Sequence, residues 1–163
     1  MRTFIFLCFI LIACHKSEGS TKNAESESLN QAVNNSQKSA VVDLGCDTDV
    51  CLKFINHDRK KLTFDIYMIN LVPVAGFQCD IPGVKIIDST GGLLKSLGFD
   101  ASNNDNRLLA FSMTGKVIAE GQGVLTTVQY ENSSAVEICL EGVVFAGEGG
   151  SNLSVADISC LDI

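Results

Sequence analysis

The sequence contains no tryptophan, and only two prolines, two tyrosines and two histidines occur among its 163 residues. Flat sugar-binding faces depend on large aromatic rings, and Tyr67 and Tyr130 are the only tyrosines that could contribute to one. His57 is the only histidine in the predicted folded part, and no nucleophile motif lies beside it. GxSxG and HExxH segments are also absent. The sequence therefore predicts a protein that is not an enzyme and that needs no metal or cofactor.

Positive charge is scarce as well. There are 12 Lys and Arg residues against 19 Asp and Glu residues, which gives a formal net charge of −7. From Val41 onward the counts are 8 basic and 16 acidic residues, so the predicted domain itself carries the negative charge. Such a surface repels the phosphate backbone of nucleic acids and anionic lipid headgroups. Nucleic acid is therefore excluded as a partner, and so is a basic membrane-binding patch.

The first residues have the pattern of an export signal. A short charged segment precedes the apolar run 4–13, which is too short to cross a bilayer as a helix. The run ends in Leu-Ile-Ala before Cys14, which resembles the lipobox of bacterial lipoproteins. This predicts a signal peptide over 1–13 and lipidation of Cys14; an ordinary signal peptide is the alternative. His15 is not the Asp that often retains lipoproteins in an inner membrane, so the outer membrane or cell surface is favoured.

The next segment is polar. Residues 15–40 contain no aromatic side chain and few branched ones, so they cannot bury enough apolar area to offset the entropy of ordering. We expect residues 14–40 to form a disordered tether that spans roughly 25–30 Å as a flexible coil. The folded domain is then 41–163.

The stretch 62–81 organises the predicted domain. Apolar and polar residues alternate on both sides of Pro73, which is the period-2 pattern of half-buried strands. The pattern predicts a hairpin of two strands that present polar residues on one outward face. This outward face is expected to carry Thr63, Asp65, Tyr67, Gln78 and Asp80.

Further short apolar segments separated by turn residues predict an all-β body. The expected strands are 51–55, 84–87, 107–114, 124–130, 136–145 and 153–161, with Leu109, Phe111 and Met113 on one face of their strand. Residues 93–98 suit a single helical turn that ends at Gly98. The oxygen-rich segment 100–106 and the acidic loop 46–51 lack the spacing of calcium loops, so both are interpreted as solvated turns without metal.

Cysteine spacing predicts two disulfides. An exported protein folds in an oxidising compartment, so Cys46 and Cys51 are expected to form a local bond. Cys139 and Cys160 lie on the last two predicted strands, and an antiparallel pairing of these strands would bring them together. Cys79 then remains as a buried, inert thiol, in phase with Phe77; a link between Cys79 and Cys46 would overturn this assignment.

Several motifs together resemble the cohesin-like domains of bacterial surface and secreted proteins. They are VPVAGFQCDI (72–81), the GG and GF pairs within 91–99, LLAFSMTGKVIAEGQGVLTTVQY (108–130) and ICLEGVVFAGEGGSNLSVADISC (138–160). The resemblance implies a jelly-roll β-sandwich of about eight to nine strands. The segment CDIPGVKI is shorter than its counterpart in cellulosomal cohesins. As a ligand, the resemblance implies a polysaccharide or a partner protein.

These features lead to one main functional hypothesis and two alternatives. The main hypothesis is a non-catalytic envelope lipoprotein whose domain binds polysaccharide or an envelope protein through the outward face defined above. Tyr67 could be a platform for sugar, but it could equally pack across strands. The first alternative is a structural lipoprotein that packs into a larger envelope assembly. The second, least favoured, is a glycoside hydrolase that uses two carboxylates, although no pair stands out in the sequence.

Overall fold

The computed structural model describes residues 45–131, 133–156 and 160–163. The predicted export signal, Cys14 and the tether lie outside these residues and stay predictions. The described residues belong to one unit, Val42–Ile163. The described part contains no helix with the length and hydrophobicity needed to span a membrane.

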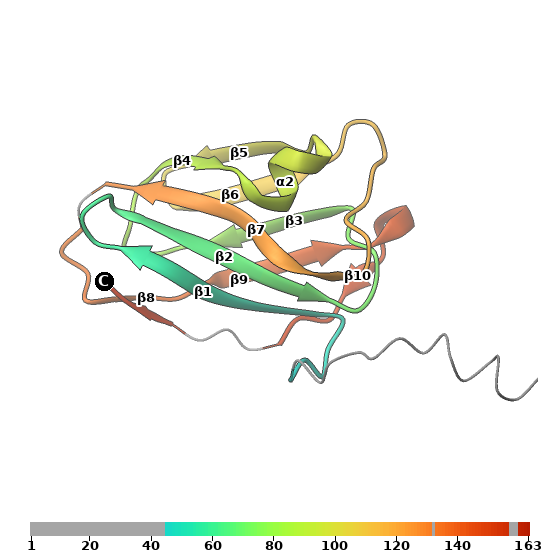
Figure 1. Cartoon of the computed structure of the whole chain (residues 1–163), viewed down its shortest axis with the longest axis horizontal. Coiled ribbons are helices and arrows are strands. Elements are labelled where there is room, and N and C mark those ends of the chain that lie inside the picture. The colour runs from blue at the N-terminus through green and yellow to red at the C-terminus, as the bar shows by residue number, and fades with distance from the viewer. Residues whose placement is uncertain (1–44, 132, 157–159) are drawn as a thin grey trace, which may run out of the picture. The chain divides into compact units, whose positions relative to one another are not determined.

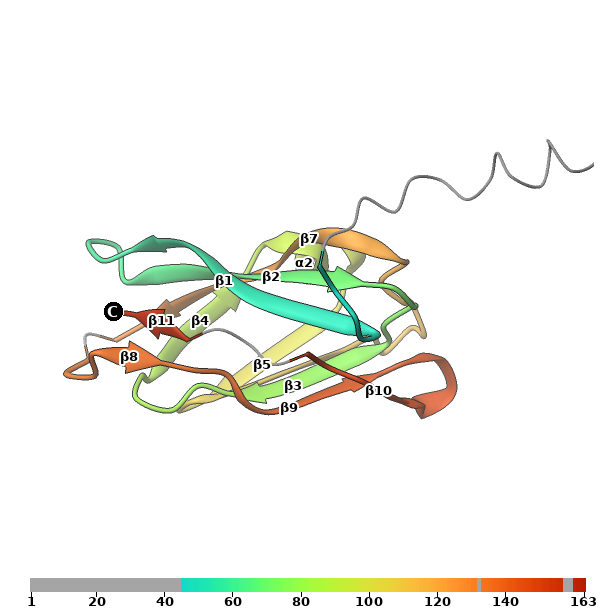
Figure 2. The ribbon, with the colours of Figure 1, turned by 90° about the horizontal axis from the view of Figure 1, so that it is seen from below.

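Two antiparallel sheets form the body of the domain. The first sheet has the order β1-β2-β7-β4, and the second has the order β10-β9-β3-β6-β5. The strands of the first sheet are β1 (Val50–Asp58), β2 (Thr63–Asn70), β4 (Ile86–Thr90) and β7 (Gly121–Tyr130). Those of the second are β3 (Gly76–Asp80), β5 (Asp100–Asn104), β6 (Arg107–Phe111), β9 (Glu141–Ala146) and β10 (Asn152–Leu153). Figure 2 shows the two sheets as separate layers.

Smaller elements complete the domain. β8 (Glu137–Ile138) pairs with β11 (Leu161–Asp162), η1 (Glu148–Gly150) is a short 3-10 turn, and α2 (Gly92–Leu97) packs against β7. Gly98 ends α2 in the left-handed conformation with φ 72°, as the sequence predicted. The all-β sandwich predicted from the alternating segments is therefore confirmed (Figure 1).

The core lies between the sheets. Side chains of β2 and β3 that the alternation placed on apolar faces are buried, among them Phe64, Ile66, Met68, Phe77 and Cys79. Aromatic contacts run through both layers. The rings of Phe77 and Phe145 stack with their centroids 5.3 Å apart, and the ring centroids of Phe64 and Tyr130 lie 5.6 Å apart. Burial of such large side chains supplies most of the favourable free energy of folding.

The predicted hairpin of 62–81 is wrong, although its two strands exist. β2 pairs with β1 and β7, whereas β3 pairs with β6 and β9. The five residues between them cross from one sheet to the other, since an extended link of this length spans about 16 Å and stacked sheets lie about 10 Å apart. Pro73 lies in this link and has no N–H group to donate to a hairpin ladder. The alternation of apolar and polar residues predicted which side chains of each strand face the core, but it did not predict which strands pair with each other.

A second correction concerns residues 100–106, which were predicted to be a solvated turn. Asp100–Asn104 forms strand β5, which pairs with β6 through a tight turn at Asp105 and Asn106. Asp105 has a φ of 49°, the left-handed conformation that Asp tolerates in such turns. The predicted strand 136–145 is likewise divided into β8 and β9 at Cys139 and Leu140.

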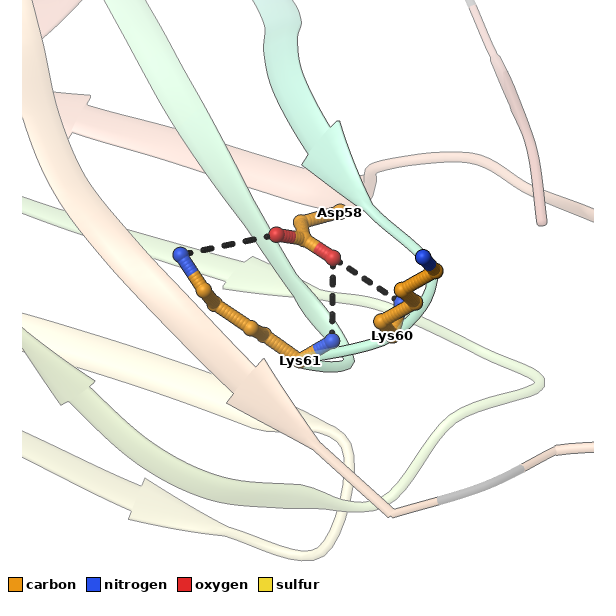
Figure 3. A network of polar contacts seen from close by, with 3 residues as sticks. All are labelled: Asp58, Lys60 and Lys61. Carbon is orange, nitrogen blue, oxygen red and sulfur yellow. Dashed lines mark hydrogen bonds and ion pairs between the residues drawn. The ribbon is translucent and has the colours of Figure 1, made fainter.

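The β1–β2 connection is a turn held by one carboxylate. Asp58 accepts backbone hydrogen bonds from Lys60 (2.9 Å) and Lys61 (3.0 Å), and the Lys61 ammonium lies 3.6 Å from the same carboxylate (Figure 3). These contacts lower the pKa of Asp58, with the hydrogen bond from the Lys61 backbone as the largest cause. His57 also lies on β1, and its Nε2 is 2.9 Å from the Tyr130 hydroxyl.

Both predicted disulfides are present in the structure. Cys46 is bonded to Cys51, and Cys139 to Cys160 next to the β8–β11 pair. Cys79 is free and buried. Burial raises its pKa to about 12, which agrees with the prediction of an inert thiol.

Candidate functional site

The five residues predicted to share one binding face lie on two different sheets. Thr63, Asp65 and Tyr67 belong to β2 in the first sheet, and Gln78 and Asp80 belong to β3 in the second. In each strand these residues alternate with core residues, so both groups point away from the interior. The two groups therefore face opposite sides of the sandwich and form no single surface, because the segment between them crosses between sheets instead of turning back.

On the first sheet, two of the three predicted binding residues, Asp65 and Tyr67, are engaged in contacts within the protein. Asp65 accepts a hydrogen bond from the Thr127 hydroxyl at 2.6 Å and another from the Asn56 amide at 2.7 Å. The ammonium of Lys53 lies over the ring of Tyr67, 4.9 Å from its centroid. A cation over the aromatic face stabilises that arrangement and competes with a sugar ring for the same surface. Tyr67 therefore acts here as a cross-strand packing residue.

On the second sheet, Asp80 is held by Arg107 across the β3–β6 pair. Arg107 Nε donates to Asp80 Oδ1 at 2.6 Å, and Nη2 donates to Oδ2 at 2.8 Å. This forked contact lowers the pKa of Asp80, with the hydrogen bond from Arg107 as the main cause. Bidentate geometry fixes both side chains at one end of the outward face.

Beside this ion pair, the second sheet exposes apolar side chains. Leu109, Phe111 and Val144 are 39%, 40% and 49% exposed, and the register places them together. Leu109 and Val144 flank Gln78 on neighbouring strands, in one row across the sheet. Phe111 lies in the next row, opposite Gly76. We call Leu109, Phe111 and Val144 the exposed stripe.

Gly76 lies between Phe111 and Ala146 in this row, and it is buried. A Cβ atom at this position would lie 3.1 Å from the carbonyl oxygen of Ala110. Met113, just beyond β6, is 74% exposed and adds a further apolar side chain near Phe111 in the sequence. The outward face of the second sheet therefore carries the exposed stripe, with the polar Gln78 between Leu109 and Val144.

Acidic groups border the exposed stripe. Asp100 is the register partner of Phe111, and Glu141 is the partner of Asp80, so both share the outward face. Neither carboxylate has an ion-pair partner within the described part of the chain. The nearby cation, Arg107, is already bound to Asp80. The rim of this face is therefore negative.

Sequence reasoning placed Leu109 and Phe111 on one face but gave no signal that this face points outward. The segment Arg-Leu-Leu-Ala-Phe is apolar on both sides of the strand, so alternation does not distinguish them. In the structure, Leu108 and Ala110 take the inward positions, in register with Cys79 and Phe77. The one available indication that this strand exposes apolar side chains is that its sequence is apolar on both faces although it belongs to an antiparallel sheet.

One cluster of metal-ligand residue types occurs in the described residues. It consists of Glu137, Cys139 and Cys160, whose ligand atoms lie within 4.8 Å of one another. The two sulfur atoms are bonded to each other as a disulfide, so Glu137 is the only member that retains a free ligand group. A single carboxylate is not a metal site.

No protein-family model matches the chain, and no curated protein sequence matches it. Solved structures similar to it include the following two. One is a non-cellulosomal cohesin from the hyperthermophilic archaeon Archaeoglobus fulgidus, with 17% identity and a TM-score of 0.46, covering 69% of this chain and 87% of that one. The other is the complex of CaDoc0917 with CaCohA2, with 14% identity and a TM-score of 0.49, covering 68% and 95%.

Proposed function

We propose that this domain is a protein-recognition module that binds a partner protein through the exposed stripe on the second sheet. The observation that supports this most directly is the exposure of three large apolar side chains on one outward face, with Leu109 and Phe111 on β6 and Val144 on the far side of Gln78 on β9. Large apolar side chains grouped on one exposed face are typical of protein interaction sites. A partner that covers it removes apolar area from water.

The chemistry of the face indicates the partner's chemistry. It carries Leu109, Phe111 and Val144 around the polar Gln78, and its rim carries the carboxylates of Asp100 and Glu141, which have no ion-pair partner among the described residues. The complementary surface has apolar side chains at its centre and Lys or Arg side chains around them. Electrostatic attraction of this kind raises the association rate and makes it fall with salt.

The proposal places the domain at the cell envelope. The predicted signal peptide, lipidation of Cys14 and the polar tether would hold the domain clear of a lipid surface, on the outer membrane or cell surface. The two disulfides support export, because such bonds persist in oxidising compartments. Binding of polysaccharide by the face of the first sheet is not favoured, because Lys53 covers the ring of Tyr67.

The experiment uses the purified protein immobilised as bait for an envelope extract, with Leu109→Ser/Phe111→Ser as the test variant. Ile87→Ser is the matched control, because Ile87 is 50% exposed and lies on β4 of the other sheet. A partner that binds through the exposed stripe is retained by the wild type and the control and lost with the double variant. The captured partner is then purified, and its association rate with the bait is measured at increasing salt.

Equal retention by all three proteins would refute the proposed face. Sedimentation of the bait alone tests a second copy as the occupant. A dimer that is lost in Leu109→Ser/Phe111→Ser would show self-association in place of recognition of another protein. Both variants change partly exposed positions, and urea unfolding of each shows whether the proteins compared in the binding experiment are folded.

A further inference from the structure

Met113 lies at the tip of the turn that follows β6, in the connection to β7 (Figure 1), and its side chain is 74% exposed. Hydrogen bonds hold this turn in place. The Lys116 N–H donates to Ser112 Oγ at 2.9 Å, and the Gly115 N–H donates to the Ser112 carbonyl at 3.4 Å. A Cβ atom added at Gly115 would meet no atom beyond its chain neighbours within 4 Å, so the tip is surrounded by open space. The thioether of Met113 is therefore accessible to small solutes.

The other sulfur atoms in the described part of the chain are protected from oxidants. Met68 is 0% exposed and lies in the core. The two disulfides engage four cysteines. Cys79 is free but buried, and burial raises its pKa to about 12, so the reactive thiolate is scarce. Met113 is thus the one exposed and unbonded sulfur among the described residues.

The chemistry that this position allows is a two-electron oxidation. A sulfur lone pair attacks one oxygen of hydrogen peroxide, and an S–O bond forms as the O–O bond breaks. The leaving hydroxide takes the proton of the transferred oxygen and becomes water, so the sulfur is oxidised to a sulfoxide and the peroxide is reduced. The product is polar where the thioether was apolar, and methionine sulfoxide reductases reverse the reaction.

Met113 follows Phe111 of the exposed stripe by two residues, so their Cα atoms lie at most about 7 Å apart. A polar sulfoxide beside this apolar surface must lose its hydration when a partner covers it, which disfavours binding. We propose that Met113 is a reversible oxidation site for peroxide and that its sulfoxide weakens binding of the partner at the exposed stripe. The effect on binding rests on the proposed function, whereas the modification itself does not.

Peptide mapping tests the modification. The purified full chain is treated with hydrogen peroxide, the peroxide is removed, and the peptides are analysed by mass spectrometry. We expect one added oxygen atom at Met113, formed about tenfold faster or more than at Met68 in the native protein, and similar rates at both after unfolding in urea. Equal rates in the native protein would overturn the proposal. So would an unmodified Met113 under conditions that oxidise free methionine.

The binding effect is measured with the oxidised protein as bait for the envelope extract. Met113→Leu is the matched control, because leucine is apolar and has no sulfur. Peroxide should lower the affinity of the wild type for the captured partner about tenfold relative to the untreated wild type. It should not lower that of Met113→Leu relative to untreated Met113→Leu. A methionine sulfoxide reductase should restore binding by the oxidised wild type.

The outcomes separate this proposal from the proposed function. Undiminished binding by the oxidised wild type would overturn the effect of the sulfoxide and leave the exposed stripe as the binding face. An equal loss in oxidised Met113→Leu would assign the loss to damage elsewhere and would also overturn it. If Leu109→Ser/Phe111→Ser retains the partner as the wild type does, the face itself is wrong, and the binding effect of Met113 is refuted with it. Peptide mapping still decides in that case whether Met113 is the oxidation site.

Discussion

Asn70 joins the link between the two sheets to the segment that precedes β7. This side chain is 1% exposed, and its amide nitrogen donates to the carbonyls of Val72 and Ala119, each at 2.9 Å. A third, longer contact reaches the Ile118 carbonyl at 3.5 Å. Replacement of Asn70 by Ala removes two good hydrogen bonds, and each contributes about 1 kcal/mol. We expect Asn70→Ala to lower the free energy of unfolding by about 2 kcal/mol.

The variant Asn70→Asp tests the contribution of the hydrogen bonds to stability separately from the contribution of the side chain's shape. The two side chains have nearly the same size, but the carboxylate presents an oxygen where the amide group donated. An ionised group would then be buried against carbonyl oxygens, which costs about 3–5 kcal/mol when no partner compensates. Burial raises the pKa of the introduced carboxyl in the folded state. The destabilisation is therefore full above the raised pKa and decreases as the pH falls below it.

Urea unfolding at pH 8 and pH 5 measures both effects. A loss of 2 kcal/mol lowers the urea midpoint by about 1 M for a domain of this size. Asn152→Ala, at an exposed asparagine on β10, is the control and should stay within about 0.5 kcal/mol of the wild type. The reasoning fails if Asn70→Ala unfolds like the wild type. It also fails if Asn70→Asp is no less stable than Asn70→Ala at pH 8 or shows no recovery at pH 5.

Three further predictions concern the thiol of Cys79, the Cys139–Cys160 disulfide and the carboxylate of Asp49. Iodoacetamide should leave Cys79 unlabelled in the native protein and label it after denaturation without reductant, because burial raises its pKa to about 12; peptide mapping that finds native labelling would contradict this. The double variant Cys139→Ala/Cys160→Ala should lose about 3 kcal/mol of stability in urea unfolding, from the loop of 21 residues that the bond closes, and an unchanged midpoint would count against it. Hydrogen bonds from Ser154 lower the pKa of Asp49, so their contribution is present above about pH 4 and is lost as the pH falls further; Ser154→Ala should move the acid-unfolding midpoint to higher pH, and an unmoved midpoint would refute this.

The sequence predicted which side chains of a strand face the core better than it predicted which strands pair with each other. Which residues of β2 and β3 face the core follows from alternation, because that property belongs to each strand alone, and the structure buries Phe64 and Phe77 as predicted. Strand partners depend on where the connection leads, and the link after Asn70 crosses to the other sheet. β5 was missed for a different reason. Its sequence, Asp-Ala-Ser-Asn-Asn, has no apolar alternation, since an edge strand with exposed side chains is defined mainly by its backbone pairing to β6.

The disulfides were predictable because their spacing and the expected compartment limited the choices, whereas the candidate binding face was not. Prediction of a face from polar alternation assumes that outward residues are hydrophilic. That assumption holds for β2, where Thr63 and Asp65 point outward, and it fails for β6, where Leu109 and Phe111 do. The assumption identified Gln78 and Asp80, which do lie on the second sheet. It did not identify the apolar neighbours of Gln78 on that sheet.

The difference between the two outward faces is the main structural argument for recognition by the second sheet. On the first sheet, polar groups satisfy one another: Asp65 accepts from Thr127 and Asn56, and Lys53 covers Tyr67. The second sheet presents the exposed stripe instead, and outward-facing apolar residues on an antiparallel sheet depart from the local rules that the rest of this chain follows. Such departures lower solubility and persist where they serve a function, so the second sheet is the face that a partner should complete.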